Sequence, residues 1–206
     1  MLKILGKAAS INVRKVLWTC DELGLPYARE DWGIGFQSTA QASFTALNPN
    51  AQVPVLVDGD FVLWESNAIC RYLAARYDGD AVLPDDAQRR ARVEQWMDWQ
   101  ATEFNNAWRY AFMALVRKSP AHQDSTQIAS SVATWNRHAG ILNQHLADRG
   151  AFIAGDTFTL ADIAIGLSLA RWQAAPIERP VFPAVDAYMA RLAPRPGYQA
   201  WAANFT

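Results

Sequence analysis

Residues 51–69 read AQVPVLVDGDFVLWESNAI. Two apolar, β-branched runs, 55–57 and 61–63, flank the turn Asp58-Gly59-Asp60, which is a strong signal for a β-hairpin. The segment that follows is amphipathic, with apolar residues at helical spacing over positions 68–73. We therefore expect a hairpin that leads directly into a helix, with Ser66 as the N-cap of that helix.

This strand-to-helix corner is a candidate site for a zwitterion. The free N–H groups and the positive end of a helix dipole favour an anion such as a carboxylate. Glu65 would repel a simple anion, but it would attract an ammonium group on the same ligand. Ser66 and the helix amides would then bind a carboxylate while Glu65 binds the ammonium. The alternative is an ordinary capped helix preceded by a solvated glutamate.

Composition limits the classes of function. The chain has 206 residues, of which 51% are hydrophobic, and 19 basic residues oppose 20 acidic ones, for a net charge of −1. No basic stripe is interleaved with aromatic residues, so we expect no nucleic-acid partner. No run of about 18 apolar residues is present, and residues 1–6 read as a short strand, so we expect no membrane span, no signal peptide and a cytoplasmic protein.

The metal-ligating residue types are few and scattered. Cys20 and Cys70 each lie in an apolar helical stripe, so we expect buried thiols and no disulfide. His122, His138 and His145 lack the spacing of metal ligands. We expect no metal site.

The order of elements in residues 1–80 predicts the fold of a first domain. A strand at 2–5, a helix with the apolar face 13–23, a second strand at 27–31 and a short helix at 39–47 precede the hairpin and its helix. This β-α-β-α-β-β-α order, with a parallel first crossover, gives a mixed four-stranded sheet and an α+β domain that resembles the thioredoxin-like fold. In that fold the bond before a proline placed like Pro54 is typically cis, so we expect a cis Val53–Pro54 bond.

The second half of the chain predicts helices alone. Residues 81–88 read as a linker, and residues 89–206 as an all-α helical bundle. One long helix or two broken ones are expected over 89–117, another helix over 125–149, and a third from Thr159, whose capping box includes Asp162. Pro183 and Pro194 are expected to open two short terminal helices.

Four segments carry a resemblance that covers essentially the whole chain. They read SINVRKVL (10–17), NPNAQVP (48–54), WESNAI (64–69) and FTLADIA (158–164). Together, in this order, they resemble a bacterial cytosolic glutathione S-transferase of the serine type (theta- or delta-like). The resemblance implies an enzyme that conjugates glutathione, its co-substrate, to small hydrophobic electrophiles. It also implies a homodimer, in which a cleft is shared between one thioredoxin-like domain and the partner's helical domain.

Glutathione fits the zwitterion interpretation of the corner. Its γ-glutamyl end carries an ammonium and a carboxylate, which suit Glu65 and Ser66. The resemblance implies that its cysteinyl backbone pairs with the main chain of Val53, next to Pro54. Its glycyl carboxylate would reach towards Gln52, where related sequences often offer a cation; Gln52 can donate hydrogen bonds with less electrostatic gain.

The catalytic task of this family is to hold the glutathione thiol as a thiolate. Ser10, just before the first helix, is the first candidate to donate a hydrogen bond to sulfur, and Asn12 is the second. A plain helix cap is the alternative role of Ser10. Arg14 and Lys15 are interpreted as a solvated helix face, with a structural ion pair as the alternative for Arg14.

Aromatic residues predict the electrophile site. Trp108, Tyr110 and Phe112 are the candidates on the second-half helices, and Phe36 could close the other side. Two other hypotheses stay open at this stage. The same fold and glutathione site could serve peroxide reduction, dehalogenation or isomerisation, or the chain could be a non-enzymatic binding module.

Overall fold

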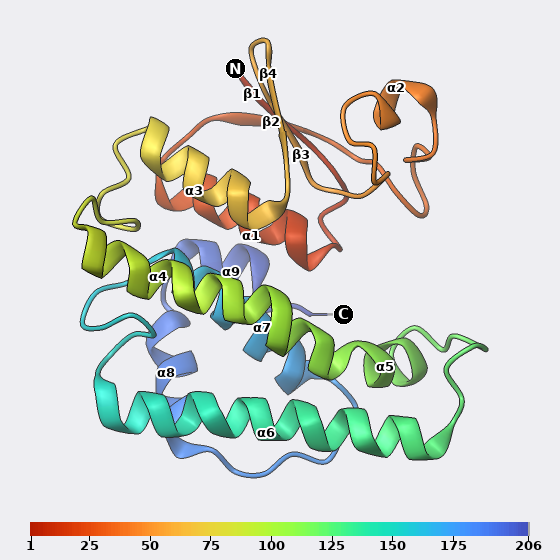
Figure 1. The fold of residues 1–206 in the computed structure, drawn as a ribbon, viewed down its shortest axis with the longest axis vertical. Coiled ribbons are helices and arrows are strands. Elements are labelled where there is room, and N and C mark those ends of the chain that lie inside the picture. The colour runs from red at the N-terminus through yellow and green to blue at the C-terminus, as the bar shows by residue number, and fades with distance from the viewer. Residues whose placement is uncertain (206) are drawn as a thin grey trace. The chain divides into compact units, whose positions relative to one another are not determined.

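A computed structural model of the protein describes residues 1–205. The chain forms two compact units, Met1–Asp85 and Asp86 onwards. The N-terminal unit contains a four-stranded sheet and three helices (Figure 1). Its elements are β1 (Leu2–Leu5), α1 (Ile11–Glu22), β2 (Tyr27–Glu30), α2 (Ala42–Thr45), β3 (Val55–Asp58), β4 (Phe61–Trp64) and α3 (Ser66–Arg76).

The sheet has the order β2-β1-β3-β4. β1 and β2 are parallel, whereas β3 is antiparallel to both β1 and β4. The predicted mixed sheet, parallel crossover and hairpin are therefore confirmed. The register places Leu5, Val55 and Trp64 in one row across the sheet, because Leu5 pairs with Val55 and Val55 with Trp64.

The two faces of the sheet are covered by different helices. α1 and α3 pack together on one side and α2 lies on the other (Figure 1). Alternation along the strands gives each face its own core. Leu5 and Val55 pack with Trp32 and with Phe44 of α2. The short helix predicted at 39–47 is confined to Ala42–Thr45, with Gln41 and Ala46 as its caps.

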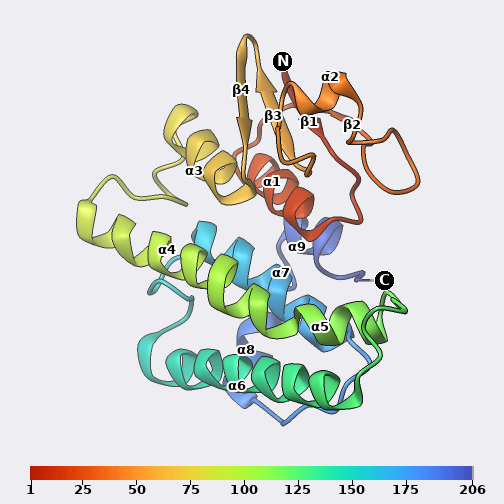
Figure 2. The ribbon, with the colours of Figure 1, turned by 45° about the vertical axis from the view of Figure 1, so that its right-hand side comes forward.

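The second unit consists of helices. They are α4 (Ala87–Trp99), the π-helical turn η1 (Gln100–Phe104), α5 (Asn105–Leu115), α6 (Ser125–Arg149), α7 (Leu160–Ala174), α8 (Pro183–Leu192) and α9 (Pro196–Trp201). In both views α4, η1 and α5 form one continuous rod, and α6 lies along it (Figures 1 and 2). The bounds predicted for α6 are confirmed. The prediction that Pro194 opens the last helix is wrong, because Arg195 is the N-cap and Pro196 takes the first helical position.

α7 is the central helix of the second unit, and all of its residues from Leu160 to Trp172 are buried. The predicted capping box is present: the Asp162 carboxylate accepts from the Thr159 amide at 2.8 Å and also from the Ile153 amide at 2.9 Å. The hydroxyl of Tyr188 donates to it at 2.9 Å. These donors compensate the buried carboxyl, whose pKa burial nevertheless raises to about 6.

Within residues 1–205, no helix combines the length and the hydropathy that a membrane span would need. The same residues contain no group of three or more His, Cys, Asp or Glu side chains placed to hold a metal ion.

Candidate functional site

Three segments flank the row formed by Leu5, Val55 and Trp64. The loop that ends at Ser10 follows Leu5, the Val53–Pro54 peptide bond precedes Val55, and Glu65 follows Trp64. Because β1 and β4 both run antiparallel to β3, all three segments lie at the same end of these strands. We call this end the sheet edge. The sheet register thus brings the predicted glutathione-binding and catalytic residues of the N-terminal unit to one place.

Gly6 makes the first of these segments pass close to the second. Its φ is 148°, and a Cβ added to it would lie 2.6 Å from Cγ2 of Val13 and 3.0 Å from Cβ of Val53. Real Cβ atoms do not tolerate such contacts, so only glycine fits here. The close approach fixes the loop before α1 against both the helix and the backbone of Val53.

Ser10 ends this loop as the N-cap of α1. Its amide donates to the Lys7 carbonyl at 3.0 Å, and its own carbonyl accepts from the Arg14 amide at 2.9 Å. The backbone is extended and the side chain makes no capping hydrogen bond. The half-buried hydroxyl is therefore not used by the helix, which leaves it available as a donor.

Arg14 and Lys15 are not a solvated helix face, and that interpretation is wrong. The Arg14 Nε donates to the Ala8 carbonyl at 2.7 Å, and burial lowers the pKa of its guanidinium. Lys15 is only 2% exposed, and its Nζ donates to Oδ1 of Asn67 at 2.9 Å. The reason is that α3 packs directly on α1 and covers the side of α1 from which Lys15 projects. Asn12 is half-buried and makes no side-chain hydrogen bond among the described residues.

Val53 presents a free main chain at the second segment. The predicted cis bond between Val53 and Pro54 is confirmed. Neither the amide nor the carbonyl of Val53 takes part in a hydrogen bond within the described residues. The preceding loop is held by Asn48, whose Nδ2 donates to the Gln52 carbonyl at 2.8 Å. The Gln52 side chain itself is exposed.

The third segment differs from the prediction at one residue. Glu65, not Ser66, is the N-cap of α3, and Ser66 is the first helical residue. The chain turns at Glu65, which adopts φ 74° and ψ 110°. A non-glycine residue in this region is strained by about 1–3 kcal/mol, and such residues concentrate at functional sites.

The side chains at this turn are not used by the fold. Ser66 is 5% exposed, yet its hydroxyl makes no hydrogen bond within residues 1–205. The amides of the first turn of α3 have no intrahelical partner, and the exposed Glu65 carboxylate has no ion pair among the described residues.

Sequence reasoning missed three features of this site: the buried Lys15, its partner Asn67, and Gly6. Asn67 follows Ser66 in the helix, so its bond to Lys15 ties the first turn of α3 to α1. Lys15 lies four residues after the buried Ile11, on the same side of α1, but nothing in the sequence indicated that the lysine itself is buried. The positive φ of Gly6 could have been suspected from its place directly after a strand.

The two cysteines take no part in the site. Both are buried and free, and their Cα positions lie in the packed helices α1 and α3. Burial raises the pKa of the Cys20 thiol far above its ordinary value, and that of Cys70 is raised for the same reason. Neither thiol is therefore a ready nucleophile.

The aromatic residues predicted to line an electrophile site have different neighbours in the structure. Trp108 and Phe112 pack edge to face with ring centroids 5.1 Å apart. The Arg171 guanidinium lies over both, at 4.5 and 4.6 Å from their centroids. Tyr110 instead contacts His122, at 4.9 Å between centroids. Phe36 belongs to the N-terminal unit, where it is 57% exposed.

The polar residues near these rings serve the helix core. Gln100 is fully buried, and its Nε2 donates to Oγ of Ser168 at 2.9 Å and to Oδ1 of Asn105 at 3.0 Å. The indole Nε1 of Trp108 also donates to Oδ1 of Asn105, at 3.2 Å.

Comparisons with known proteins agree with this fold. The family model described as "Glutathione S-transferase, N-terminal domain" matches residues 1–75, and the corresponding C-terminal domain model matches residues 125–191. Glutathione S-transferase GstB of Escherichia coli is 42% identical over 167 residues, which cover 80% of each chain. Glutathione S-transferase 3 of Zea mays is 35% identical over 96% of this chain and 91% of its own.

A solved structure extends the similarity to the whole length. The theta class glutathione S-transferase of Xanthomonas axonopodis pv. citri, solved with glutathione bound, superposes with a TM-score of 0.93. It is 38% identical in sequence, and the match covers 100% of this chain and 99% of that one. The chain belongs to the glutathione S-transferase family.

Proposed function

We propose that this glutathione transferase binds glutathione at the sheet edge marked by Ser10, Val53 and Glu65 and transfers it to small hydrophobic electrophiles. One observation carries the proposal. The register brings a free hydroxyl, a free peptide group and an unpaired carboxylate to one edge of the sheet. The Ser66 hydroxyl beside them also has no partner among the described residues, although the residue is only 5% exposed, and this is unusual for a buried polar group.

The γ-glutamyl end of glutathione is assigned to the start of α3. The Glu65 carboxylate binds its ammonium, while the Ser66 hydroxyl and the first-turn amides bind its carboxylate. The bond from Lys15 to Asn67 adds a buried positive charge to the same turn. Positive charge there favours a bound carboxylate.

The remaining contacts follow from the second segment. The amide and carbonyl of Val53 pair with the cysteinyl backbone of glutathione, as one strand pairs with another. Gln52, exposed beside it, donates to the glycyl carboxylate. Pro54 fixes the direction in which Val53 presents its peptide group.

Ser10 then donates its hydroxyl hydrogen to the sulfur. A free thiol with a pKa near 8.5 is only a few per cent ionised at neutral pH. Lowering that pKa by about two units stabilises the thiolate by roughly 2.7 kcal/mol and makes it the major species. A hydroxyl donor and the N-terminus of α1 together can supply this energy. Asn12 is the alternative donor.

We assign the electrophile to Trp108 and Phe112, whose rings pack on each other. Tyr110 is a weaker candidate because its ring packs on His122 instead, and Phe36 is a further candidate from the N-terminal unit, where it is exposed. Attack of a thiolate on an electrophilic carbon needs no further general acid. We also propose that the protein is a homodimer and acts in the cytoplasm.

Calorimetric titration with glutathione and with an analogue that lacks the γ-glutamyl amino group tests the assignment of Glu65. Glu65→Gln should weaken glutathione binding about tenfold and leave analogue binding nearly unchanged, because only glutathione offers an ammonium to the carboxylate. Glu22→Gln, on the same domain but at the far end of α1, is the control. Equal losses for both ligands would contradict the zwitterion assignment, and no binding of glutathione by the unmodified protein would contradict the proposal as a whole.

A further inference from the structure

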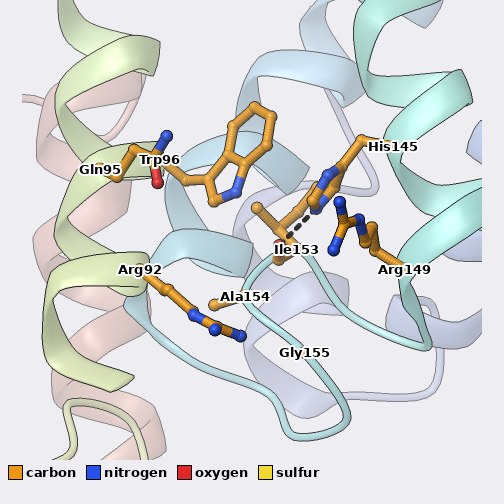
Figure 3. A pocket seen from close by; sticks show the side chains of 8 residues that line it. All are labelled: Arg92, Gln95, Trp96, His145, Arg149, Ile153, Ala154 and Gly155. Carbon is orange, nitrogen blue, oxygen red and sulfur yellow. Dashed lines mark hydrogen bonds between the residues drawn. The ribbon is translucent and has the colours of Figure 1, made fainter. Parts of the chain in front are cut away.

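Two half-buried tryptophans, Trp96 and Trp108, lie on the rod formed by α4, η1 and α5, and the structure holds them differently. Trp96 lines a hollow of about 280 Å³, to which Arg92 of α4 and Arg149 of α6 also contribute (Figure 3). Its indole packs on the ring of His145, with centroids 4.5 Å apart. Because its N–H makes no hydrogen bond within residues 1–205, only packing orients Trp96.

Trp108, by contrast, is oriented by a hydrogen bond. Its Nε1 donates to Oδ1 of Asn105 at 3.2 Å, while its ring packs edge to face on Phe112 and lies under the guanidinium of Arg171. Ring contacts tolerate several directions of an indole, whereas a bond to Nε1 selects one of them. The bond also satisfies the only polar group of the indole, so the part of the ring that stays exposed offers an apolar surface.

The π-helical turn η1 brings Asn105 to its partner in the rod, Gln100. The backbone bond of a π-helix joins residues five apart, and here the Asn105 amide donates to the Gln100 carbonyl. The side chains of the two residues also meet, because Nε2 of Gln100 donates to Oδ1 of Asn105 at 3.0 Å. Side chains that face each other on an α-helix are three or four residues apart. The contact therefore depends on the irregular turn, and such turns are frequent at functional sites.

The hydrogen-bond network ends on the central helix α7. The second hydrogen of Gln100 Nε2 is donated to Oγ of Ser168 at 2.9 Å, and that hydroxyl donates to the Ala164 carbonyl at 2.8 Å. Gln100 and Ser168 are both buried. A buried network in which each of these donors has an acceptor is rigid. Oδ1 of Asn105 is thereby fixed relative to α7, and the indole of Trp108 is fixed with it.

We propose that Asn105 is a positioning residue of the transferase, which fixes the indole of Trp108 as one wall of the electrophile site and so favours flat aromatic electrophiles over small alkyl ones. The inference rests on the proposed function, which assigns the electrophile to Trp108. An aromatic electrophile gains from a ring of fixed direction, because the contact between two rings depends on the angle between them. A small alkyl electrophile has no such requirement.

Steady-state kinetics with the aryl halide 1-chloro-2,4-dinitrobenzene and with iodoethane test the inference. Asn105→Leu removes the acceptor, so KM for the aryl halide should rise about fivefold, whereas kcat and the KM for iodoethane should stay unchanged. Asn105→Asp keeps the acceptor and should retain the original KM, because the amide nitrogen of Asn105 makes no hydrogen bond among the described residues. The matched control is Asn106→Leu, which changes an exposed neighbour whose side chain makes no hydrogen bond within residues 1–205.

Two further measurements distinguish positioning from a general loss of stability. In the Trp108→Phe background no indole hydrogen is present, so Asn105→Leu should raise KM by less than about twofold. The indole N–H resonance of Trp108, identified by its absence from Trp108→Phe, should exchange with solvent faster in Asn105→Leu than in Asn106→Leu. Trp96→Phe, which removes an N–H that has no acceptor among the described residues, should leave KM unchanged. If circular dichroism shows that Asn105→Leu does not fold, Asn105→Ala takes its place.

Three results would overturn the inference. An unchanged KM for the aryl halide in an active Asn105→Leu variant would remove the positioning role and leave the proposed function standing. Equal rises in KM for both electrophiles, or an equal effect of Asn105→Leu with and without the indole of Trp108, would indicate a general loss of stability instead. An unmodified protein that binds no glutathione would contradict the proposed function, and this inference with it.

Discussion

The sheet edge of the N-terminal unit and the aromatic cluster of the C-terminal unit present their side chains in opposite ways. At the sheet edge, the hydroxyls of Ser10 and Ser66 and the carboxylate of Glu65 make no hydrogen bond among the described residues. In the cluster, Trp108 and Phe112 already pack on each other and on Arg171. The first region is prepared for a polar ligand of fixed shape, whereas the second offers an apolar surface that is also part of the fold.

The difference indicates where specificity resides. Polar groups held by backbone register and left unpaired recognise one ligand, because any other ligand leaves them unsatisfied. Packed rings discriminate weakly among apolar groups, at about 1–3 kcal/mol for each methylene. We therefore expect changes at the sheet edge to act on glutathione itself, and changes in the cluster to act on the choice of electrophile.

Gly6→Ala should have the largest effect, because Gly6 allows the loop before α1 to pack closely against α1 and Val53. The added Cβ would lie 2.6 Å from Val13 Cγ2, so we expect a loss of about 3 kcal/mol in the free energy of unfolding and loss of glutathione binding. Urea unfolding measures the free energy of unfolding, and calorimetric titration measures glutathione binding. The control is Gly59→Ala, at the hairpin turn, where φ is 62° and nothing lies within 4 Å of the added Cβ. It should cost about 1 kcal/mol and leave binding intact; equal losses would contradict the role of Gly6.

Ser10→Ala should separate catalysis from folding. Because the hydroxyl makes no capping bond, the free energy of unfolding should change by less than about 0.5 kcal/mol. Loss of the donor to sulfur should lower kcat/KM about 100-fold, as loss of one preorganised donor does in other enzymes. Steady-state kinetics with an aryl halide measures the effect. A larger loss in Asn12→Ala than in Ser10→Ala would transfer the role to Asn12.

Lys15→Met should destabilise the first turn of α3, which contains Ser66. The change leaves Oδ1 of buried Asn67 without the Lys15 donor, and we expect a loss of about 2 kcal/mol in the free energy of unfolding. Glutathione binding should weaken as well, since the buried positive charge is lost. Lys3→Met provides the comparison: Lys3 bonds Glu30 at 2.8 Å, but both side chains are more than two-fifths exposed, so the change should cost less than about 0.5 kcal/mol. Similar costs at both positions would refute a special role for Lys15.

Trp108→Phe should have the smallest effect and should act on the electrophile alone. We expect KM for an aromatic electrophile to change severalfold, with glutathione affinity unchanged, because the smaller ring alters the apolar surface and no polar contact to glutathione. Tyr110→Phe, whose ring lies against His122, should change KM less. A stronger response at Tyr110 would reverse our assignment of the electrophile surface.

Much of the fold followed from local patterns in the sequence. The hairpin at 55–64, helix α6 and the Thr159–Asp162 capping box all rest on residues close to one another in the chain, where turn chemistry and periodicity act directly. The cis bond before Pro54 came from the family resemblance rather than from the residues themselves. The N-cap of α3 lies one residue earlier than predicted. The prediction relied on the preference of serine for N-caps, whereas Glu65 adopts a positive φ and takes that position.

The contacts between elements could not be predicted. Burial of Lys15 depends on how α3 lies across α1, and the charge pattern of α1 alone suggested a solvated face. The directions of Trp108 and Tyr110 depend on the packing of α5 against its neighbours. The hollow between Arg92 and Arg149 likewise joins α4 and α6 at positions far apart in the sequence.

The pKa of the glutathione thiol in the complex tests the account most directly. It is measured from the thiolate absorbance of the protein–glutathione complex as the pH is varied. We predict a pKa about two units below that of free glutathione, and a return towards the free value in Ser10→Ala. Glutathione that binds with an unshifted thiol pKa would contradict the proposed mechanism.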